Sequence, residues 1–187
     1  ADCTGHGVPG AFMSMLGIAF MNEIVNKITI NKHIRSLQAN EILNQLREQV
    51  IQSLHQTKEN NQSIEGMDIA LCIVDYAEKQ LQFAGAHNPL YLIRKNELHQ
   101  YKADKMPVSV HRKAGEPFTN HVIDLKEGDM LYIFSDGFID QFGGDNDEKF
   151  YSRRFKDLLL DIHEFPMHEQ KKIIGQTLDK WIGKGEQ

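Results

Sequence analysis

The residues best suited to chemistry lie at the start of the chain, on a glycine-rich segment. Asp2 precedes Gly5, Gly7 and Gly10, and an apolar stretch begins at Ala11. Three glycines and a proline so close together exclude a helix or a regular strand, and glycine lets backbone N–H and C=O groups approach an ion or a phosphate. The segment is therefore either a turn that holds a charged ligand or a tight strand-to-helix connection without one.

A second acidic residue of interest is Asp136, in the tripeptide Ser135-Asp136-Gly137 after an apolar stretch. Mg²⁺ and Mn²⁺ prefer carboxylate, carbonyl and water oxygens as ligands. The Asp136 carboxylate could instead bind N–H groups of its own turn. Asp2 and Asp136 lie far apart in the sequence, so only the fold could bring them together.

Cys3 and His6 allow a different chemistry, in which a thiol acts as nucleophile and an imidazole as its base. That hypothesis predicts activity that survives EDTA and is lost in Cys3→Ala, and a metal-dependent reaction predicts the reverse. His6 could also contact a phosphate, protonate a leaving oxygen, or only hydrogen-bond the backbone of the turn.

The elements that must position these residues are helices on either side of a run of short strands, which predicts an α+β protein. Residues 11–27 carry too many apolar side chains for one narrow stripe, which predicts a largely buried helix. In the next helix, Arg47 falls on the polar side. We expect helices over 11–27, 36–55, 152–162 and 167–181, an antiparallel meander over 68–74, 81–86, 90–94 and 98–101, and a further strand pair over 118–125 and 130–134.

The composition bounds the class of protein. The chain has 187 residues, 41% of them hydrophobic, and a formal net charge of −5. This predicts one soluble domain over residues 1–187. The 21 Lys and Arg are scattered among 26 Asp and Glu, which argues against nucleic-acid binding. The uncharged stretch 7–22 is too short for a membrane span, and Cys3 and Cys72 lack a zinc-ligand spacing, so we expect a cytoplasmic protein.

Four short motifs occur in order along the chain. They are Asp2-Cys3-Thr4-Gly5-His6-Gly7-Val8-Pro9-Gly10-Ala11, Gly66-Met67-Asp68-Ile69-Ala70, Ala84-Gly85-Ala86-His87-Asn88-Pro89-Leu90-Tyr91 and Leu131-Tyr132-Ile133-Phe134-Ser135-Asp136-Gly137. The first is similar to an Asp-x-[Ser/Thr]-Gly-His-Gly signature. Together the four resemble the SpoIIE-type branch of the PPM metal-dependent protein phosphatases.

The resemblance implies a fold and a site. The fold is an α-β-β-α sandwich of two antiparallel sheets packed face to face, with helices on both outer faces and metals at one end. Asp2 would bridge two Mn²⁺ or Mg²⁺ ions, the Cys3 carbonyl would bind one of them, and Asp136 the other. A water activated by the metals would hydrolyse phosphoserine or phosphothreonine, with Asp2, Asp136 and His6 as the catalytic residues.

Two other motif residues have more than one interpretation. In the resembling family, the segment around Asp68 adjoins a helical switch that communicates regulatory state to the metals, whereas by itself Asp68 could cap the start of a strand. His87, in His87-Asn88-Pro89, indicates a turn between strands, because Asn and Pro are turn formers.

The sequence also departs from the family pattern at both ends. Family members usually begin with strands that carry a Gly-Gly-Asp-aromatic motif and end with Asp-Asp before a last strand, and neither occurs in residues 1–187. If the resemblance holds, one acidic ligand is missing at each end, so Asp2 and Asp136 alone would hold metal weakly and the fragment would have little activity. Missing strands would expose sheet edges, which favours pairing into a homodimer.

The implied role is that of a protein Ser/Thr phosphatase, the output domain of a bacterial signalling regulator. Its substrate would be a phosphorylated protein of the anti-sigma-factor-antagonist type, and a sensory or receiver domain would precede Ala1. The alternative is a module of the same fold that holds a phosphoprotein or a partner kinase without catalysis.

Overall fold

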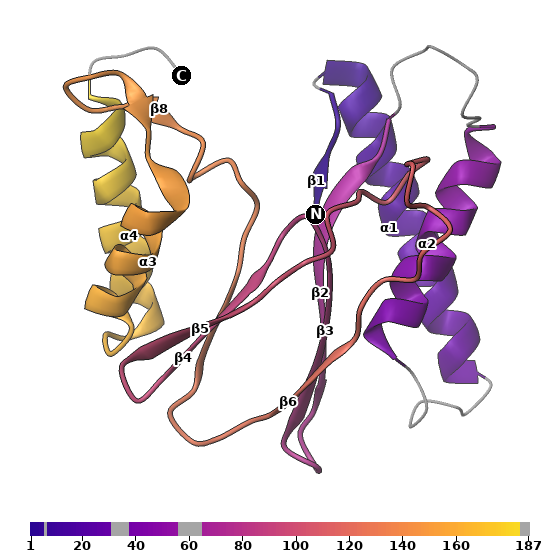
Figure 1. Ribbon diagram of the computed structural model, residues 1–187, viewed down its shortest axis with the longest axis horizontal. Helices are drawn as coiled ribbons and strands as arrows, with labels where there is room; N and C mark the ends of the chain where they lie inside the picture. Colours follow the sequence, from indigo (N-terminus) through magenta and orange to yellow (C-terminus); the bar gives the residue numbers. More distant parts are fainter. Residues whose placement is uncertain (6, 31–37, 56–64, 184–187) are drawn as a thin grey trace. The chain divides into compact units, whose positions relative to one another are not determined.

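The computed structural model describes residues 1–5, 7–30, 38–55 and 65–183. They form two compact units, Ala1–Leu90 with Tyr101–Glu127, and Tyr91–Gln100 with Gly128–Gln187. Helices and antiparallel strands make up both, as Figure 1 shows, which confirms the α+β class. The elements are β1 (Asp2–Cys3), α1 (Gly7–Ile30), α2 (Ala39–Ser53), β2 (Met67–Asp75), β3 (Gln80–Ala86), β4 (Leu90–Arg94), β5 (Glu97–Tyr101), β6 (His121–Asp124), β7 (Met130–Ile133), β8 (Phe142–Gly143), β9 (Glu148–Lys149), α3 (Tyr151–Ile162) and α4 (Met167–Ile182).

The first unit is a four-stranded sheet covered on one face by α1 and α2 (Figure 1). The strand order is β1-β2-β3-β6, and each neighbouring pair is antiparallel. Met67 and Ile69 of β2 are buried together with side chains of both helices. Because side chains alternate between the two faces of a strand, Asp68 lies on the face away from these helices.

Helix α2 confirms the predicted apolar stripe but corrects one residue. Its core positions are buried, at Ala39, Ile42, Leu43, Leu46 and Val50. Arg47, expected on the polar side, is also buried and only 6% exposed. Its guanidinium donates a hydrogen bond to the Glu116 carbonyl, which is far along the chain. Helical spacing alone does not reveal such a contact.

Helix α1 is much less buried than predicted. Met13 and Ile24 are in the core, but Val8, Phe12, Met15 and Ile18 are exposed. The helix is apolar on all sides, and α2 with the sheet covers only one of them. The stretch Gly7–Lys27 is also long and apolar enough to cross a membrane by length and composition, and 17% of an 18-residue apolar window within it is buried. Core helices of proteins and signal sequences meet the same criterion.

The second unit contains a three-stranded sheet of order β5-β4-β7, the β8–β9 hairpin, α3 and α4. Lys95 and Asn96 both have positive φ, at 50° and 64°, as the two central residues of a type I′ hairpin turn require. The core is rich in aromatic rings, among them Tyr91, Phe134 and Phe155 in contact with one another. Helix α4 contacts the β8–β9 hairpin through a hydrogen bond to the Trp181 carbonyl.

The four strands predicted over residues 68–101 are confirmed, and so are the β2–β3 and β4–β5 pairs. The predicted continuous meander is wrong between β3 and β4, where the chain changes sheets. Strand β3 pairs with β2 and β6, whereas β4 lies between β5 and β7. His87, at φ 57°, and Pro89, which lacks an N–H donor, interrupt the ladder after Ala86. Strands β6 and β7, which were predicted to pair across the turn between them, also belong to different sheets and are not partners.

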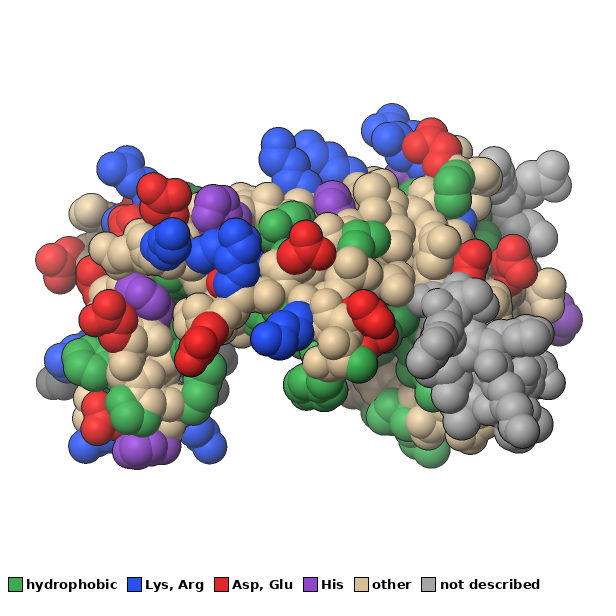
Figure 2. Space-filling view, turned by 90° about the horizontal axis from the view of Figure 1, so that it is seen from below, with side chains coloured by type: hydrophobic (Ala, Val, Ile, Leu, Met, Phe, Trp, Pro, Cys, Tyr) green, Lys and Arg blue, Asp and Glu red, His purple; other side chains and the backbone are tan. Residues whose placement is uncertain are grey.

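Charged side chains of both signs lie side by side on the surface shown in Figure 2. This agrees with the near balance of 21 basic and 26 acidic residues. Interspersed charge of this kind favours solubility and gives weak long-range attraction for a polyanion.

Candidate metal-binding and catalytic site

The glycine-rich segment forms a sharp turn between β1 and α1. Gly5 and Gly7 have φ of 87° and 66°, a backbone conformation that favours glycine. The turn is tied to the sheet by the Thr4 N–H, which donates to the Gly66 carbonyl at 2.9 Å. A Cβ on Gly10 would lie 2.6 Å from the Gly5 carbonyl oxygen. Gly5, Gly7 and Gly10 therefore each permit a part of this turn that another residue would strain.

Gly10→Ala tests how strictly the turn is packed. The added methyl would contact backbone rather than a flexible side chain, so the turn must move and the start of α1 with it. We expect a loss of about 1–3 kcal/mol in the free energy of unfolding, the usual cost of overpacking, measured by urea denaturation. Gly115→Ala is the matched control, since a Cβ there meets nothing within 4 Å. Equal stability of the two variants would contradict the tight turn.

Asp2 is placed on the sheet by the pairing of β1 with β2. In that antiparallel pair, Asp2 lies directly opposite Asp68, and Cys3 lies opposite Met67. Directly opposed side chains share a face and have Cβ atoms about 4.5–5.5 Å apart, and like charges in this arrangement are destabilising. Two carboxylates in register therefore need a compensating positive group, which a bound cation or a basic side chain can supply.

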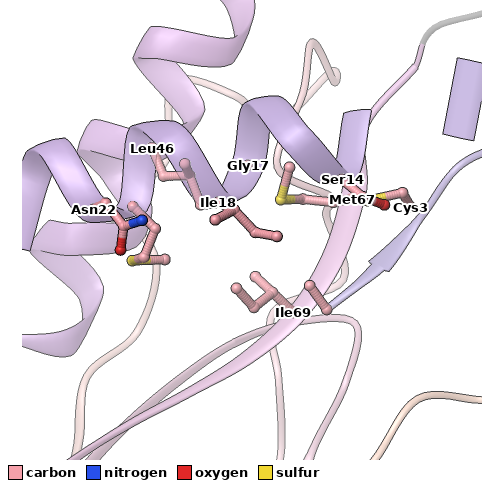
Figure 3. Close-up of a pocket in the computed structure, with 10 residues that line it drawn as sticks. Cys3, Ser14, Gly17, Ile18, Asn22, Leu46, Met67 and Ile69 are labelled. Carbon is pink, nitrogen blue, oxygen red and sulfur yellow. The ribbon is translucent and has the colours of Figure 1, made fainter. Parts of the chain in front are cut away.

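Cys3 and Met67 point to the other face, toward α1. Figure 3 shows them with Ile69, Ile18 and other side chains around a cavity of about 430 Å³ below the helix. The Ser14 hydroxyl lies 3.4 Å from the Cys3 sulfur. The thiol therefore projects into a largely apolar space on the opposite side of the strand from Asp2.

A polar hollow of about 300 Å³ adjoins the turn, and its lining includes Asp2, Gly5, Gly10 and Ser14. Cys3 also lines this hollow. The carboxylate, hydroxyl and backbone carbonyl oxygens of the lining are ligands that Mg²⁺ and Mn²⁺ prefer. Within the described residues, no cluster of three or more His, Cys, Asp or Glu side chains is arranged to hold a metal. The donor chemistry of this unit thus fits a hard divalent cation with water completing its coordination.

Asp136 lies in the second unit, three residues after β7 ends at Ile133. Its carbonyl accepts a hydrogen bond from the Asp140 N–H at 2.8 Å, so it begins the turn that the sequence predicted. Lys149 bonds the Asp140 carboxylate at 2.7 Å. This hydrogen bond is the main cause that raises the pKa of Lys149, and the charges of Asp140 and Asp136 add to it. Asp136 is thus exposed at a strand end, with the Lys149 ammonium group nearby.

The four motifs match one family throughout. The SpoIIE family model, described as Stage II sporulation protein E, matches residues 1–187. The chain belongs to the SpoIIE family. The SiaA-PP2C domain of Pseudomonas aeruginosa is 30% identical, with a TM-score of 0.83 over 98% of this chain and 68% of that one. The comparison with curated proteins gave no match.

Two more distant structures share the fold. The PP2C phosphatase domain of SpoIIE from Bacillus subtilis has a TM-score of 0.67 at 14% identity, over 95% of this chain and 47% of that one. The serine/threonine phosphatase PstP of Mycobacterium tuberculosis has a TM-score of 0.55 at 15% identity, over 96% and 80%. These likenesses confirm the predicted PPM fold of this SpoIIE-family chain, and PPM phosphatases are a metal-dependent family.

The remaining motif residues of the SpoIIE-family chain include an interaction that the sequence did not predict. His6 lies outside the described residues. The Asp68 carboxylate, expected to be a strand cap or part of a switch, is 2.8 Å from Nδ1 of His87. The two residues belong to separate motifs, and only the pairing of β2 with β3 brings them together. An aspartate among apolar strand residues was the one signal that could have indicated a partner.

Proposed function

We propose that this SpoIIE-family chain is the catalytic region of a metal-dependent protein serine/threonine phosphatase. The observation that carries the proposal is Asp2, held on β1 next to the glycine turn and directly opposite Asp68, beside a hollow with oxygen donors. His87 lies against the Asp68 carboxylate, and a cation at Asp2 would balance the second of the two opposed carboxylates. Family membership supports the same reaction class.

Each proposed ligand contributes an oxygen. Asp2, the Cys3 carbonyl and Asp136 would hold Mn²⁺ or Mg²⁺. When bound, such ions polarise phosphoryl oxygens and lower the pKa of water. The chain then needs no nucleophile of its own. Cys72 is unsuited to that role, since burial raises its pKa to about 11.

The substrate and partners follow from the family. We propose a phosphoserine or phosphothreonine protein of the anti-sigma-factor-antagonist type, acted on in the cytoplasm. A solved structure of the RsbU and RsbW domains of a Mycobacterium tuberculosis protein, 20% identical with a TM-score of 0.63, supports a partner-regulated setting. A single domain over residues 1–187, a sensory or receiver domain before it, and a homodimer complete the proposal. The chain spans 68% of the SiaA-PP2C chain and 46% of the RsbU–RsbW chain.

The proposal is tested by phosphate release from a phosphoserine peptide and an aryl phosphate, using the full-length protein that contains these residues. Activity should require Mn²⁺ or Mg²⁺ and stop on addition of EDTA. A folded wild-type protein that hydrolyses neither substrate would instead indicate a module that binds a phosphoprotein without catalysis.

Cys3→Ala separates the metal reaction from thiol chemistry. We expect the variant to keep its activity within about threefold, because the thiol faces the cavity below α1 while Asp2 faces away, and only the Cys3 carbonyl is a proposed ligand. The rate with saturating Mn²⁺ is the measurement, and Cys72→Ala is the control for removal of a thiol. Activity that resists EDTA but disappears in Cys3→Ala would establish a cysteine hydrolase instead.

A further inference from the structure

Three side chains form a row across the sheet of the first unit, at one end of its ladder. Asp2 lies opposite Asp68, and His87 comes directly after Ala86, which lies opposite Ile69. The row therefore runs Asp2, Asp68, His87 over three neighbouring strands. With strands about 4.8 Å apart, the backbones at Asp2 and His87 are separated by about 10 Å.

The backbone at His87 is held in an unusual conformation. Its φ is 57°, and the Asn88 N–H donates to the Ala86 carbonyl at 2.7 Å across it, a three-residue turn that costs free energy to maintain. The His87 N–H donates to the Asp104 carbonyl at 3.0 Å. A Cβ on Gly85 would lie 2.6 Å from the Asn88 carbonyl oxygen, so the turn is also closely packed. These contacts fix the backbone from which the imidazole reaches Asp68.

The contact with Asp68 determines which ring nitrogen is available. An ionised carboxylate can only accept a hydrogen bond, so the proton in the 2.8 Å contact with the Asp68 carboxylate is on Nδ1 of His87. Within the described residues, Nδ1 is the ring nitrogen that contacts a protein side chain, and the His87 side chain is 41% exposed. Nε2 is then the atom that can meet a substrate. A carboxylate that fixes a histidine through Nδ1 is the arrangement that general acid–base catalysis uses.

We propose that His87, oriented by Asp68, is the general acid of the phosphatase reaction; this inference rests on the proposed function. The oxygen of water forms the new bond to phosphorus as the bond from phosphorus to the seryl or threonyl oxygen breaks, and the protons of that water leave with the phosphate. The leaving oxygen takes the proton from Nε2 of the imidazolium. The neutral His87 ring keeps the proton on Nδ1, hydrogen-bonded to the Asp68 carboxylate. Nε2 then takes a new proton from solvent. His87 is the catalytic residue and Asp68 a positioning residue.

Two conservative variants isolate the two nitrogens of His87. In His87→Asn the side-chain amide can still donate to Asp68, and Asn tolerates positive φ, but the Nε2 position is lost. His87→Gln places an amide near the Nε2 position without a proton that it can transfer. The other variants are Asp68→Asn with Asp75→Asn, at the far end of the same strand, as its control, His6→Asn as the rival acid, and His168→Gln on the exposed surface of α4.

The activity test compares a phosphoserine peptide with 4-nitrophenyl phosphate in the full-length protein with Mn²⁺. An alkoxide needs a proton to leave, whereas a nitrophenolate does not. We expect His87→Asn and His87→Gln to lower peptide hydrolysis by about 10²–10⁴-fold and nitrophenyl phosphate hydrolysis by less than about tenfold. Full peptide activity, an equal loss on both substrates, or the selective loss in His6→Asn instead would overturn the assignment. Wild-type protein inactive on both substrates would overturn the proposed function and this step with it.

A second measurement does not depend on activity. Long-range ¹H–¹⁵N spectra of the metal-free protein report which nitrogen of His87 carries the proton in the neutral ring. We expect the proton on Nδ1 in the wild type and in Asp75→Asn, and a shift of the proton toward Nε2 in Asp68→Asn. A neutral His87 with its proton on Nε2 in the wild type would overturn the role of Asp68, whatever the rates show.

Discussion

Asp2→Asn and Asp136→Asn are each expected to lower Mn²⁺-dependent phosphate release by about 10³-fold or more. Lewis-acid stabilisation by a bound divalent ion supplies several kcal/mol, and each 1.36 kcal/mol changes a rate tenfold. Asparagine keeps the size of the side chain but removes the negative charge that attracts the cation. The measurement is kcat/KM on a phosphoserine peptide over a series of Mn²⁺ concentrations, together with Mn²⁺ affinity by calorimetry.

The controls separate loss of metal from loss of fold. Asp75→Asn alters β2 at the end away from Asp2, and Asp145→Asn alters the exposed turn between β8 and β9; both should keep wild-type activity. Asp2→Asn should also be at least as stable as the wild type without metal, because it removes one of two opposed negative charges. If the Asn variants bind Mn²⁺ and turn over substrate as the wild type does, the assignment of both ligands is wrong.

The parts of the fold that the sequence predicted well are those with a local cause. A turn at the glycines was predicted, and Gly5 and Gly7 have positive φ while Gly10 allows close backbone approach. The expectation that this segment excludes a helix was wrong, because α1 begins at Gly7 and its first turn includes Gly10. Strand β4 has the bounds predicted from its apolar run, Leu90–Arg94. Helix α2 was predicted from three- and four-residue spacing, and its stripe is buried.

The parts that the sequence did not predict depend on partners chosen by the whole fold. A strand's own residues do not reveal which sheet it joins, so the change of sheet at His87 was missed. The opposition of Asp2 and Asp68 depends on the register of β1 and β2, and β1 is only two residues long. The Asp68–His87 contact needs β2 and β3 in register as well. The candidate site was therefore predicted as a set of motifs, and its geometry required the structure.

The burial of Arg47 is another feature that the sequence did not predict. Arg47 connects the core to the turn at His87. Its guanidinium donates to the Glu116 carbonyl at 2.8 Å and lies over the Phe118 ring, 4.7 Å from the centroid. The next residue, Thr119, donates from its N–H to the Asp104 carboxylate at 2.7 Å. The Asp104 carbonyl in turn accepts from the His87 N–H. Residues 102–120, which lack long regular elements, are thus fixed between α2 and the proposed acid.

Arg47→Ala is therefore expected to lower the free energy of unfolding by about 3 kcal/mol. The Glu116 carbonyl loses a charged donor, which costs about 1–3 kcal/mol, and the loss of side-chain packing adds to this. Relief of the desolvation of a buried cation, which also lowers the pKa of Arg47, offsets part of the loss. A decrease of about 6–12 °C in Tm should follow at this chain length.

A comparison of Arg47→Met with Arg47→Ala divides that loss between packing and hydrogen bonding. Methionine fills most of the volume and removes the buried charge, so we expect a loss of about 1 kcal/mol, since replacing a buried ion by an apolar side chain of similar size is often well tolerated. Arg153→Ala, on the exposed face of α3, should change stability by less than about 0.5 kcal/mol. If Arg47 also fixes the loop, amide exchange at His87 should be faster in both Arg47 variants than in Arg153→Ala. Unchanged exchange at His87 would show that the loop holds its turn without Arg47, and the stability loss would then be confined to the core around α2.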